Sequence, residues 1–224
     1  MRHLIFLALG LLAARRLMKL CRKPTSGDGR LVLWGMNLSH SRLTNWGLTH
    51  VQIGKQFTIL DVGCGGGRTV QKLAAMATEG KVYGVDYSES SVAASRRTNR
   101  QEIDAGRVAI QLASVSRLPF PDRTFDLVTA VETHYYWPDL PADVREIRRV
   151  LKSGGTLLII AEAYKGSAYD ALYGLVMKAL KAAYLTVEEH RDLLSTAGYS
   201  DVEVFTERKK GWICVTGKRP ESSS

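Results

Sequence analysis

The chain has 224 residues and a formal net charge of +9, and its apolar and charged fractions are ordinary for a globular protein. That length suits one domain with a single sizeable core. The three cysteines, Cys21, Cys64 and Cys214, have no paired spacing, which argues against a disulfide framework or a zinc site and favours the reducing cytoplasm. The charge allows an anionic partner, but no basic motif interleaved with aromatic residues is visible, so nucleic acid is disfavoured.

The first 29 residues differ from the rest. Residues 4–14 are almost wholly apolar, and five basic side chains follow before residue 24. The apolar run is too short to span a bilayer as a helix, and no convincing signal-peptide cleavage site follows it. We expect either an interfacial helix that makes a peripheral membrane contact through residues 1–24, or a segment that packs on the domain or is disordered. Turn residues then predict a linker that ends near residue 29.

Residues 57–68 carry the most informative pattern. An apolar run ends in Asp61, and glycines follow at alternate positions, Gly63, Gly65 and Gly67. This spacing predicts a buried parallel strand, a tight turn and a helix that begins near Arg68. Glycine suits such a turn because a side chain would fill the space that a closely approaching ligand needs. The N–H groups at the helix start favour an anionic or oxygen-bearing part of that ligand.

The next predicted strand, residues 81–85, ends in Asp86. An acid at this point is placed to accept hydrogen bonds from both ribose hydroxyls of a nucleoside. The dinucleotide-binding fingerprint has a third glycine where Arg68 stands, and an acid at Asp61 is not part of it. The pattern therefore favours a nucleoside ligand and disfavours a nicotinamide oxidoreductase.

Strands and helices alternate along the remaining chain, which predicts an α/β sheet with helices on both faces and a final antiparallel hairpin. Residues 162–185 are an insertion with an aromatic and aliphatic face. Helices are expected over residues 90–102 and 140–151, and another is expected to begin at Thr186, which forms a capping box with Glu189. A turn is expected at Gly154 and Gly155. The remaining strands are expected over residues 108–112, 125–131, 156–161, 201–207 and 212–217.

Asp61, the alternating glycines and Asp86 together resemble the class I S-adenosylmethionine-dependent methyltransferases, and within them the ubiquinone-biosynthesis-like, small-molecule branch. The similarity continues through residues 118–126 and 146–155. It implies a Rossmann-like methyltransferase domain over residues 30–218, with a seven-stranded, mostly parallel sheet, after the extension and linker of residues 1–29. Residues 219–224 are then a disordered tail.

The resemblance implies S-adenosyl-L-methionine as the cofactor and assigns its binding residues. Gly63, Gly65 and the backbone of Cys64 would approach the methionine part. Asp61 would fix the loop and reach the amino group, and Asp86 would hold the ribose hydroxyls.

The adenine would lie against residues that follow the second and third strands. Tyr87 is expected over the ring, and Ser114 and Val115 beside it. Family members usually have an acid where Ser114 stands, so the resemblance carries over less directly at this position.

Four further residues follow the fourth predicted strand: Glu132, His134, Tyr135 and Trp137. Ligands of open parallel sheets bind outside the carboxyl ends of the strands, so we expect these residues beside the transferred methyl. Aromatic faces attract a sulfonium cation. If the acceptor is a hydroxyl, a general base helps, and His134 is the first candidate, followed by Glu132, His40 and Tyr135. The alternative for the aromatic side chains is packing beneath a turn.

Asn37, His40 and Trp46 look like the N-terminal segment that covers the cofactor in related methyltransferases. We expect them to line the mouth of the cofactor or substrate site. The alternative is that Trp46 belongs to the core and that His40 lies at the surface or caps a helix.

The sequence thus predicts a cytoplasmic enzyme that transfers a methyl group to a small-molecule acceptor by in-line displacement and needs no metal. Two alternatives remain: an RNA or protein methyltransferase that uses the basic surface, and a non-catalytic nucleoside-binding protein of the same fold. A nucleic-acid amino methyltransferase is disfavoured because Glu132-Thr-His-Tyr stands where its Asn/Asp-Pro-Pro-aromatic motif would follow the fourth strand.

Overall fold

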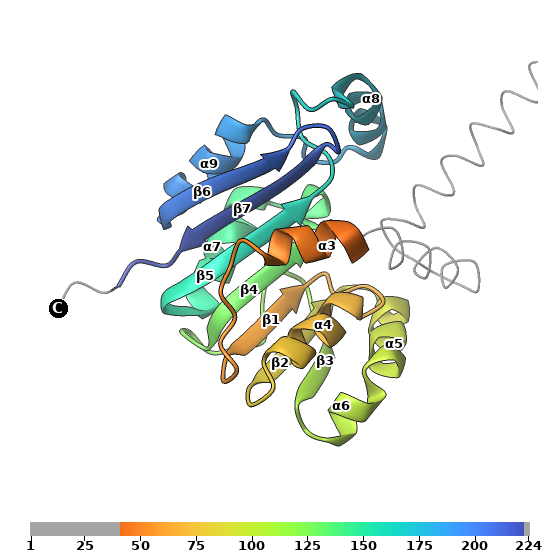
Figure 1. Ribbon diagram of the computed structural model, residues 1–224, viewed down its shortest axis with the longest axis vertical. Coiled ribbons are helices and arrows are strands. Elements are labelled where there is room, and N and C mark those ends of the chain that lie inside the picture. The colour runs from red at the N-terminus through yellow and green to blue at the C-terminus, as the bar shows by residue number, and fades with distance from the viewer. Residues whose placement is uncertain (1–40, 222–224) are drawn as a thin grey trace, which may run out of the picture.

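Seven strands form one sheet in the order β3-β2-β1-β4-β5-β7-β6 in the computed structural model, which describes residues 41–221 (Figure 1). Neighbouring strands from β3 to β5 run parallel, whereas β7 is antiparallel to both β5 and β6. The expected fold class is confirmed. The strands are β1 (Thr58–Val62), β2 (Lys81–Asp86), β3 (Val108–Leu112), β4 (Phe125–Val131), β5 (Leu151–Ala161), β6 (Ser200–Glu207) and β7 (Trp212–Lys218).

Helices cover both faces of the sheet, with α3, α4 and α5 on the near face in Figure 1 and α7 behind. The helices are α3 (Ser41–Leu48), α4 (Arg68–Met76), α5 (Glu89–Thr98), α6 (Arg100–Asp104), η1 (His134–Tyr136), α7 (Leu140–Val150), α8 (Asp170–Leu180) and α9 (Val187–Thr196). Side chains of β5 alternate between two buried clusters. Leu157 and Ile159 join the cluster with α7 and α9, and Leu158 and Ile160 join the cluster with α3, α4 and α5. Strands buried on both faces explain the near-continuous apolar runs in the sequence.

Two elements differ from the sequence prediction. The helix expected over residues 90–102 is broken at Asn99, whose buried side-chain amide donates to the carbonyls of Gly67 and Ser95. The turn expected at Gly154 and Gly155 is part of β5, where the pairing register with β4 shifts. Gly154 has φ +74°, so this glycine accommodates a bulge within the strand and does not precede it.

The start of α9 is confirmed as a capping box. The backbone N–H of Glu189 donates to the Thr186 hydroxyl at 3.0 Å, and the Glu189 carboxylate accepts the Thr186 N–H at 2.7 Å. These two bonds satisfy backbone donors that a helix end otherwise leaves without partners. Gly198 follows the helix with φ +85°, the left-handed conformation that glycine adopts without steric penalty.

We expect Thr186→Ala to lower the free energy of unfolding by about 1 kcal/mol, because the cap loses its hydroxyl acceptor. Urea unfolding measures this change. Thr196→Ala, at the exposed last position of the same helix, is the matched control and should change stability by less than about half as much. Equal losses in the two variants would contradict the capping role.

Candidate active site

A pocket of about 260 Å³ opens at the carboxyl ends of β1, β2, β3 and β4. This is the edge of a parallel sheet at which ligands of such folds bind. Its walls combine one buried carboxylate with mostly apolar and aromatic side chains. The lining residues are Val62, Gly63, Val85, Asp86, Tyr87, Ala113, Ser114, Val115, Thr133, Tyr136, Trp137 and Pro138.

The glycine turn after β1 is held against β2 by backbone hydrogen bonds. The N–H groups of Gly63 and Cys64 both donate to the carbonyl of Val85, at 2.8 and 3.0 Å. Gly63 has φ +73°, and a Cβ there would lie 2.1 Å from Thr133 Oγ1. Only glycine fits this position, which leaves the pocket wall between β1 and β4 as bare backbone.

The side chain of Cys64 points away from the pocket toward α5. Its Sγ lies 3.7 Å from Ser95 Oγ, and burial raises the pKa of the thiol well above its ordinary value. A buried, protonated thiol is not a nucleophile. Cys64 therefore fills space beneath the turn.

Asp86 closes the pocket at the tip of β2. Its Oδ2 accepts the N–H of Gly65 at 3.0 Å, and its Oδ1 accepts the N–H of Ser88 at 2.9 Å. Burial raises the pKa of the carboxyl, and these hydrogen bonds act in the opposite direction. Tyr87 and Ser91 also donate to this carboxylate, which lines the pocket and therefore lies within reach of a ligand.

Asp61 lies behind the pocket wall. It is fully buried, and its Oδ1 accepts the hydroxyl hydrogen of Thr129 at 2.7 Å. Burial raises the pKa of this carboxyl to about 7, and the charge of Asp86 adds to the effect. Two carboxyl groups withdrawn from water make this end of the sheet favourable for a positive charge.

Residues after β2 and β3 form another wall of the pocket. Tyr87 is half exposed, whereas Val115 is buried, and both line the pocket together with Ser114. The aromatic side chains of Tyr136 and Trp137 complete the lining from the segment after β4. Such a slot suits a flat, apolar ring with polar edges.

Glu132 and Tyr135 form a hydrogen-bond cluster beside the pocket. The Tyr135 hydroxyl donates to Glu132 Oε1 at 3.2 Å and accepts the N–H groups of Glu162 and Ala163, each at 3.1 Å. The cluster ties the end of β4 to the end of β5. The backbone of Glu132 has φ +56°, a left-handed conformation that is rare for residues other than glycine and is often found at functional sites.

His134 points away from the pocket toward α9. Its Nε2 lies 3.2 Å from Nε2 of His190, and Nδ1 of His190 lies 2.7 Å from the carbonyl of Thr186. Because a carbonyl only accepts, His190 carries its proton on Nδ1, and His134 donates through Nε2. Both rings are buried, which lowers the pKa of each. This geometry places His134 in the core and not among the lining residues.

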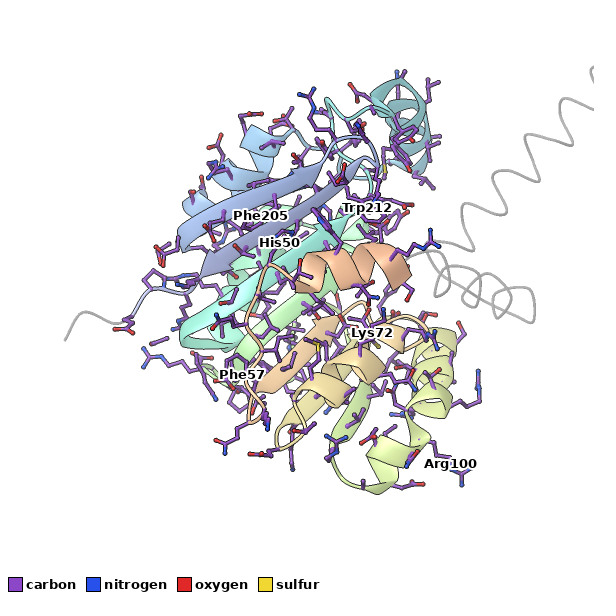
Figure 2. All side chains as sticks on the ribbon, in the orientation of Figure 1. His50, Phe57, Lys72, Arg100, Phe205 and Trp212 are labelled. Carbon is purple, nitrogen blue, oxygen red and sulfur yellow. The ribbon has the colours of Figure 1, made fainter. Side chains whose placement is uncertain are left out.

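Trp46 is another aromatic residue that the sequence assigned to the site. It lies on α3, and its ring centroid is 5.8 Å from that of Trp212 and 4.9 Å from that of His50, two residues labelled in Figure 2. It is absent from the pocket lining. Asn37 and His40 lie outside the described residues, so their expected place at the mouth of the site stays a prediction.

Sequence reasoning missed Thr133, Tyr136 and Ala113 as lining residues. All three adjoin predicted site residues, but the direction of each side chain depends on the short helix η1 and on the loop after β3. No periodic signal marks either segment. In the part of the chain that the structure describes, no group of His, Cys, Asp or Glu could hold a metal ion.

Comparisons with known proteins agree with this geometry. Residues 60–159 match the family model described as a methyltransferase domain. The 27-O-demethylrifamycin SV methyltransferase of Amycolatopsis mediterranei is 33% identical over 144 residues, which cover 57% of this chain and 52% of that protein. The demethylmenaquinone methyltransferase of Symbiobacterium thermophilum is 39% identical over 113 residues, 50% of this chain and 44% of that protein.

The fold is similar to that of human N-acetylserotonin methyltransferase solved with S-adenosylmethionine. The TM-score is 0.71 at 19% identity, over 87% of this chain and 57% of that one. This chain spans about half the length of the curated relatives that it matches first. The similarity therefore concerns the domain that contains the pocket.

We expect Asp61→Asn to change how stability depends on pH. The folded pKa of about 7 exceeds the ordinary value of 3.8, so the native state holds a proton that the unfolded chain releases. The stability that this bound proton contributes to the native state is fully present below about pH 4 and is lost as pH rises to about 7. The loss is about 1.4 kcal/mol per pH unit and about 4 kcal/mol in total. Asparagine mimics the protonated acid and does not titrate.

Urea unfolding of both proteins without ligand at intervals between pH 4 and 8 measures the effect. The asparagine variant should gain stability relative to the wild type as pH rises through this window. Asp104→Asn, at an exposed position on α6, is the control and should track the wild type. Parallel curves for all three proteins would mean that Asp61 is ionised in the native state.

Proposed function

We propose that this chain is a class I S-adenosylmethionine-dependent methyltransferase and that it transfers a methyl group from the cofactor to a small-molecule acceptor. One observation carries the proposal. A buried carboxylate at the tip of β2 and a glycine turn at the tip of β1 face the same pocket, and the pocket has aromatic walls. That combination suits a nucleoside linked to a charged amino-acid part.

The residues present fit the cofactor. Asp86 lines the pocket at the tip of β2, where its carboxylate can accept hydrogen bonds from ribose hydroxyls. Tyr87 and Val115 offer faces to the adenine, and Ser114 offers a hydroxyl to its edge. Gly63 leaves room for the methionine part, and the buried acid Asp61 favours a nearby ammonium group. When bound, the cofactor supplies an activated methyl on a sulfonium.

A small acceptor is supported by two features. The names of two relatives describe methylation of a rifamycin and of a demethylmenaquinone, both small molecules. Tyr136 and Trp137 give the pocket an apolar, aromatic side suited to such an acceptor and to a sulfonium cation.

Of the candidate general bases, His40 lies outside the described residues, and Glu132, His134 and Tyr135 do not line the pocket. His134 is bonded to His190, and the Tyr135 hydroxyl is occupied by Glu132 and two backbone N–H groups. We therefore favour a transfer in which these residues position the segment after β4 and the reaction relies on orientation. An amine, a thiol or a stabilised carbanion would react in this way without a strong base.

The location of the protein remains a prediction. None of the helices within residues 41–221 has both the length and the apolar character needed to cross a bilayer. The peripheral contact that we propose for residues 1–24 falls outside the described residues. A cytoplasmic location agrees with the need for a cytoplasmic nucleoside cofactor.

Calorimetric titration with S-adenosylhomocysteine tests the cofactor site. We expect Asp86→Ala to weaken binding at least about tenfold, because hydrogen bonds to a charged acceptor contribute about 1.5–3 kcal/mol. Asp104→Ala, an exposed acid on α6, is the matched control and should bind as the wild type does. Asp86→Asn keeps the side-chain shape and one acceptor oxygen, and should give an intermediate loss.

Circular dichroism shows whether each variant is folded, since Asp86 also holds the glycine turn. Unchanged affinity in folded Asp86→Ala would remove this residue from the cofactor site. Binding by wild type without methyl transfer to any acceptor, in a broad screen of small molecules, would favour a non-catalytic nucleoside-binding protein.

A further inference from the structure

Helix α8 is apolar on the side that faces away from the protein. Met177 is buried and Tyr173 is half-buried against the core cluster that packs on α7 and α9. On the outer side, Leu175 is 72% exposed and Val176 36% exposed, and the exposed Ala171 and Ala179 lie one turn before and after Leu175. Asp170 and Lys178 are the charged residues of this helix, and the outer side between them is apolar. Within the described residues, the core cluster covers only the inner side of the helix.

The helix stands at the end of the molecule where β6 turns into β7 (Figure 1). Tyr169, just before α8, is 45% exposed, and a Cβ at Gly211 in this turn would lie 3.1 Å from its ring. The apolar helix and the β6–β7 turn are therefore neighbours.

The β6–β7 turn is basic. Arg208, Lys209 and Lys210 follow one another and are exposed, and Lys210 Nζ lies 4.5 Å from the centroid of the Trp212 ring. Lys178 and Lys181, both exposed, add positive charge at the far end of α8.

Acidic side chains also lie in this region. Asp170 accepts the hydroxyl hydrogen of Tyr184 at 2.6 Å, Glu189 is paired with Lys165 at 3.2 Å, and Glu207 ends β6 just before the turn. Three successive basic residues still leave the turn with a net positive charge. The surface therefore combines exposed aliphatic and aromatic side chains with a basic rim.

We propose that α8 and the β6–β7 turn form a docking surface for an anionic lipid bilayer. Leu175, Val176 and Tyr169 would enter the interfacial region, and the flanking lysines would extend their charged ends to the lipid phosphates. Anionic lipid complements this charge, whereas a purely apolar partner would leave the basic rim without counter-charges. The proposal concerns α8 and the β6–β7 turn alone and does not depend on methyl transfer.

Two other occupants of the apolar side are conceivable and are decided by the test. A second copy of the chain would carry the same positive charge to the contact. A part of this chain outside residues 41–221 would cover α8 even in the absence of lipid.

An environment-sensitive fluorophore on α8 tests the proposal in the full chain. Leu175→Cys, in a background with Cys21→Ser, takes the label, while Cys64 and Cys214 are buried and stay unlabelled. The matched control carries the same label through Asp104→Cys, at an exposed position on α6. Each protein is mixed with phosphatidylcholine vesicles that contain or lack phosphatidylserine.

We expect the label at position 175 to shift to the blue and to be quenched by lipid-borne quenchers, only with the anionic vesicles. The label at position 104 should not respond. No response at 175 while the protein sediments with the vesicles would overturn the proposal and assign binding to another segment. A label at position 175 that is already blue-shifted before lipid is added would also overturn the proposal. If that shift depends on protein concentration, a second copy of the chain covers α8; if it does not, another part of the same chain covers it.

Charge variants provide the second measurement. Arg208→Gln with Lys209→Gln should weaken sedimentation with anionic vesicles at least about fivefold, since each basic residue near the surface contributes to the attraction. Arg97→Gln with Arg100→Gln removes the same charge from exposed positions on α5 and α6. Equal losses in the two pairs would indicate that overall charge, and not this surface, drives binding.

Discussion

The hydrogen bonds between the glycine turn and the tip of β2 are the constraint on which the pocket depends. Gly63 and Cys64 donate to Val85, and Gly65 donates to the carboxylate of Asp86. These bonds bring the carboxyl ends of β1 and β2 together and leave bare backbone opposite Thr133. A larger residue at the first glycine would separate the turn from β4. The fold thus sets the width of the site through backbone contacts, and side chains then decide its chemistry.

The buried acidic side chains give the pocket a preference for positively charged ligands. Asp61 and Asp86 are both withdrawn from water, and burial raises the pKa of each carboxyl. A ligand with a positive charge close to these acids would relieve their mutual repulsion, whereas an anion would increase it. The aromatic side chains that line the pocket also attract a positive charge. The pocket therefore suits a cationic nucleoside better than a nucleotide with phosphates.

Much of this arrangement could be predicted because it follows from local rules. Asp86 and Gly63 lie where strand periodicity and the carboxyl-end rule place them, and α9 begins where its capping box predicts. The direction of His134 could not be predicted, because it depends on His190, 56 residues later in the chain. Trp46 likewise finds its partner in β7. Side chains in irregular segments are oriented by distant contacts that no periodic pattern encodes.

A crystal structure of the full chain with S-adenosylhomocysteine tests the central claim most directly. The account predicts the ribose against Asp86, the adenine between Tyr87 and Val115, and the amino-acid part beside Gly63. Density for the ligand at another place in the molecule, or an unoccupied pocket at saturating ligand, would contradict the account.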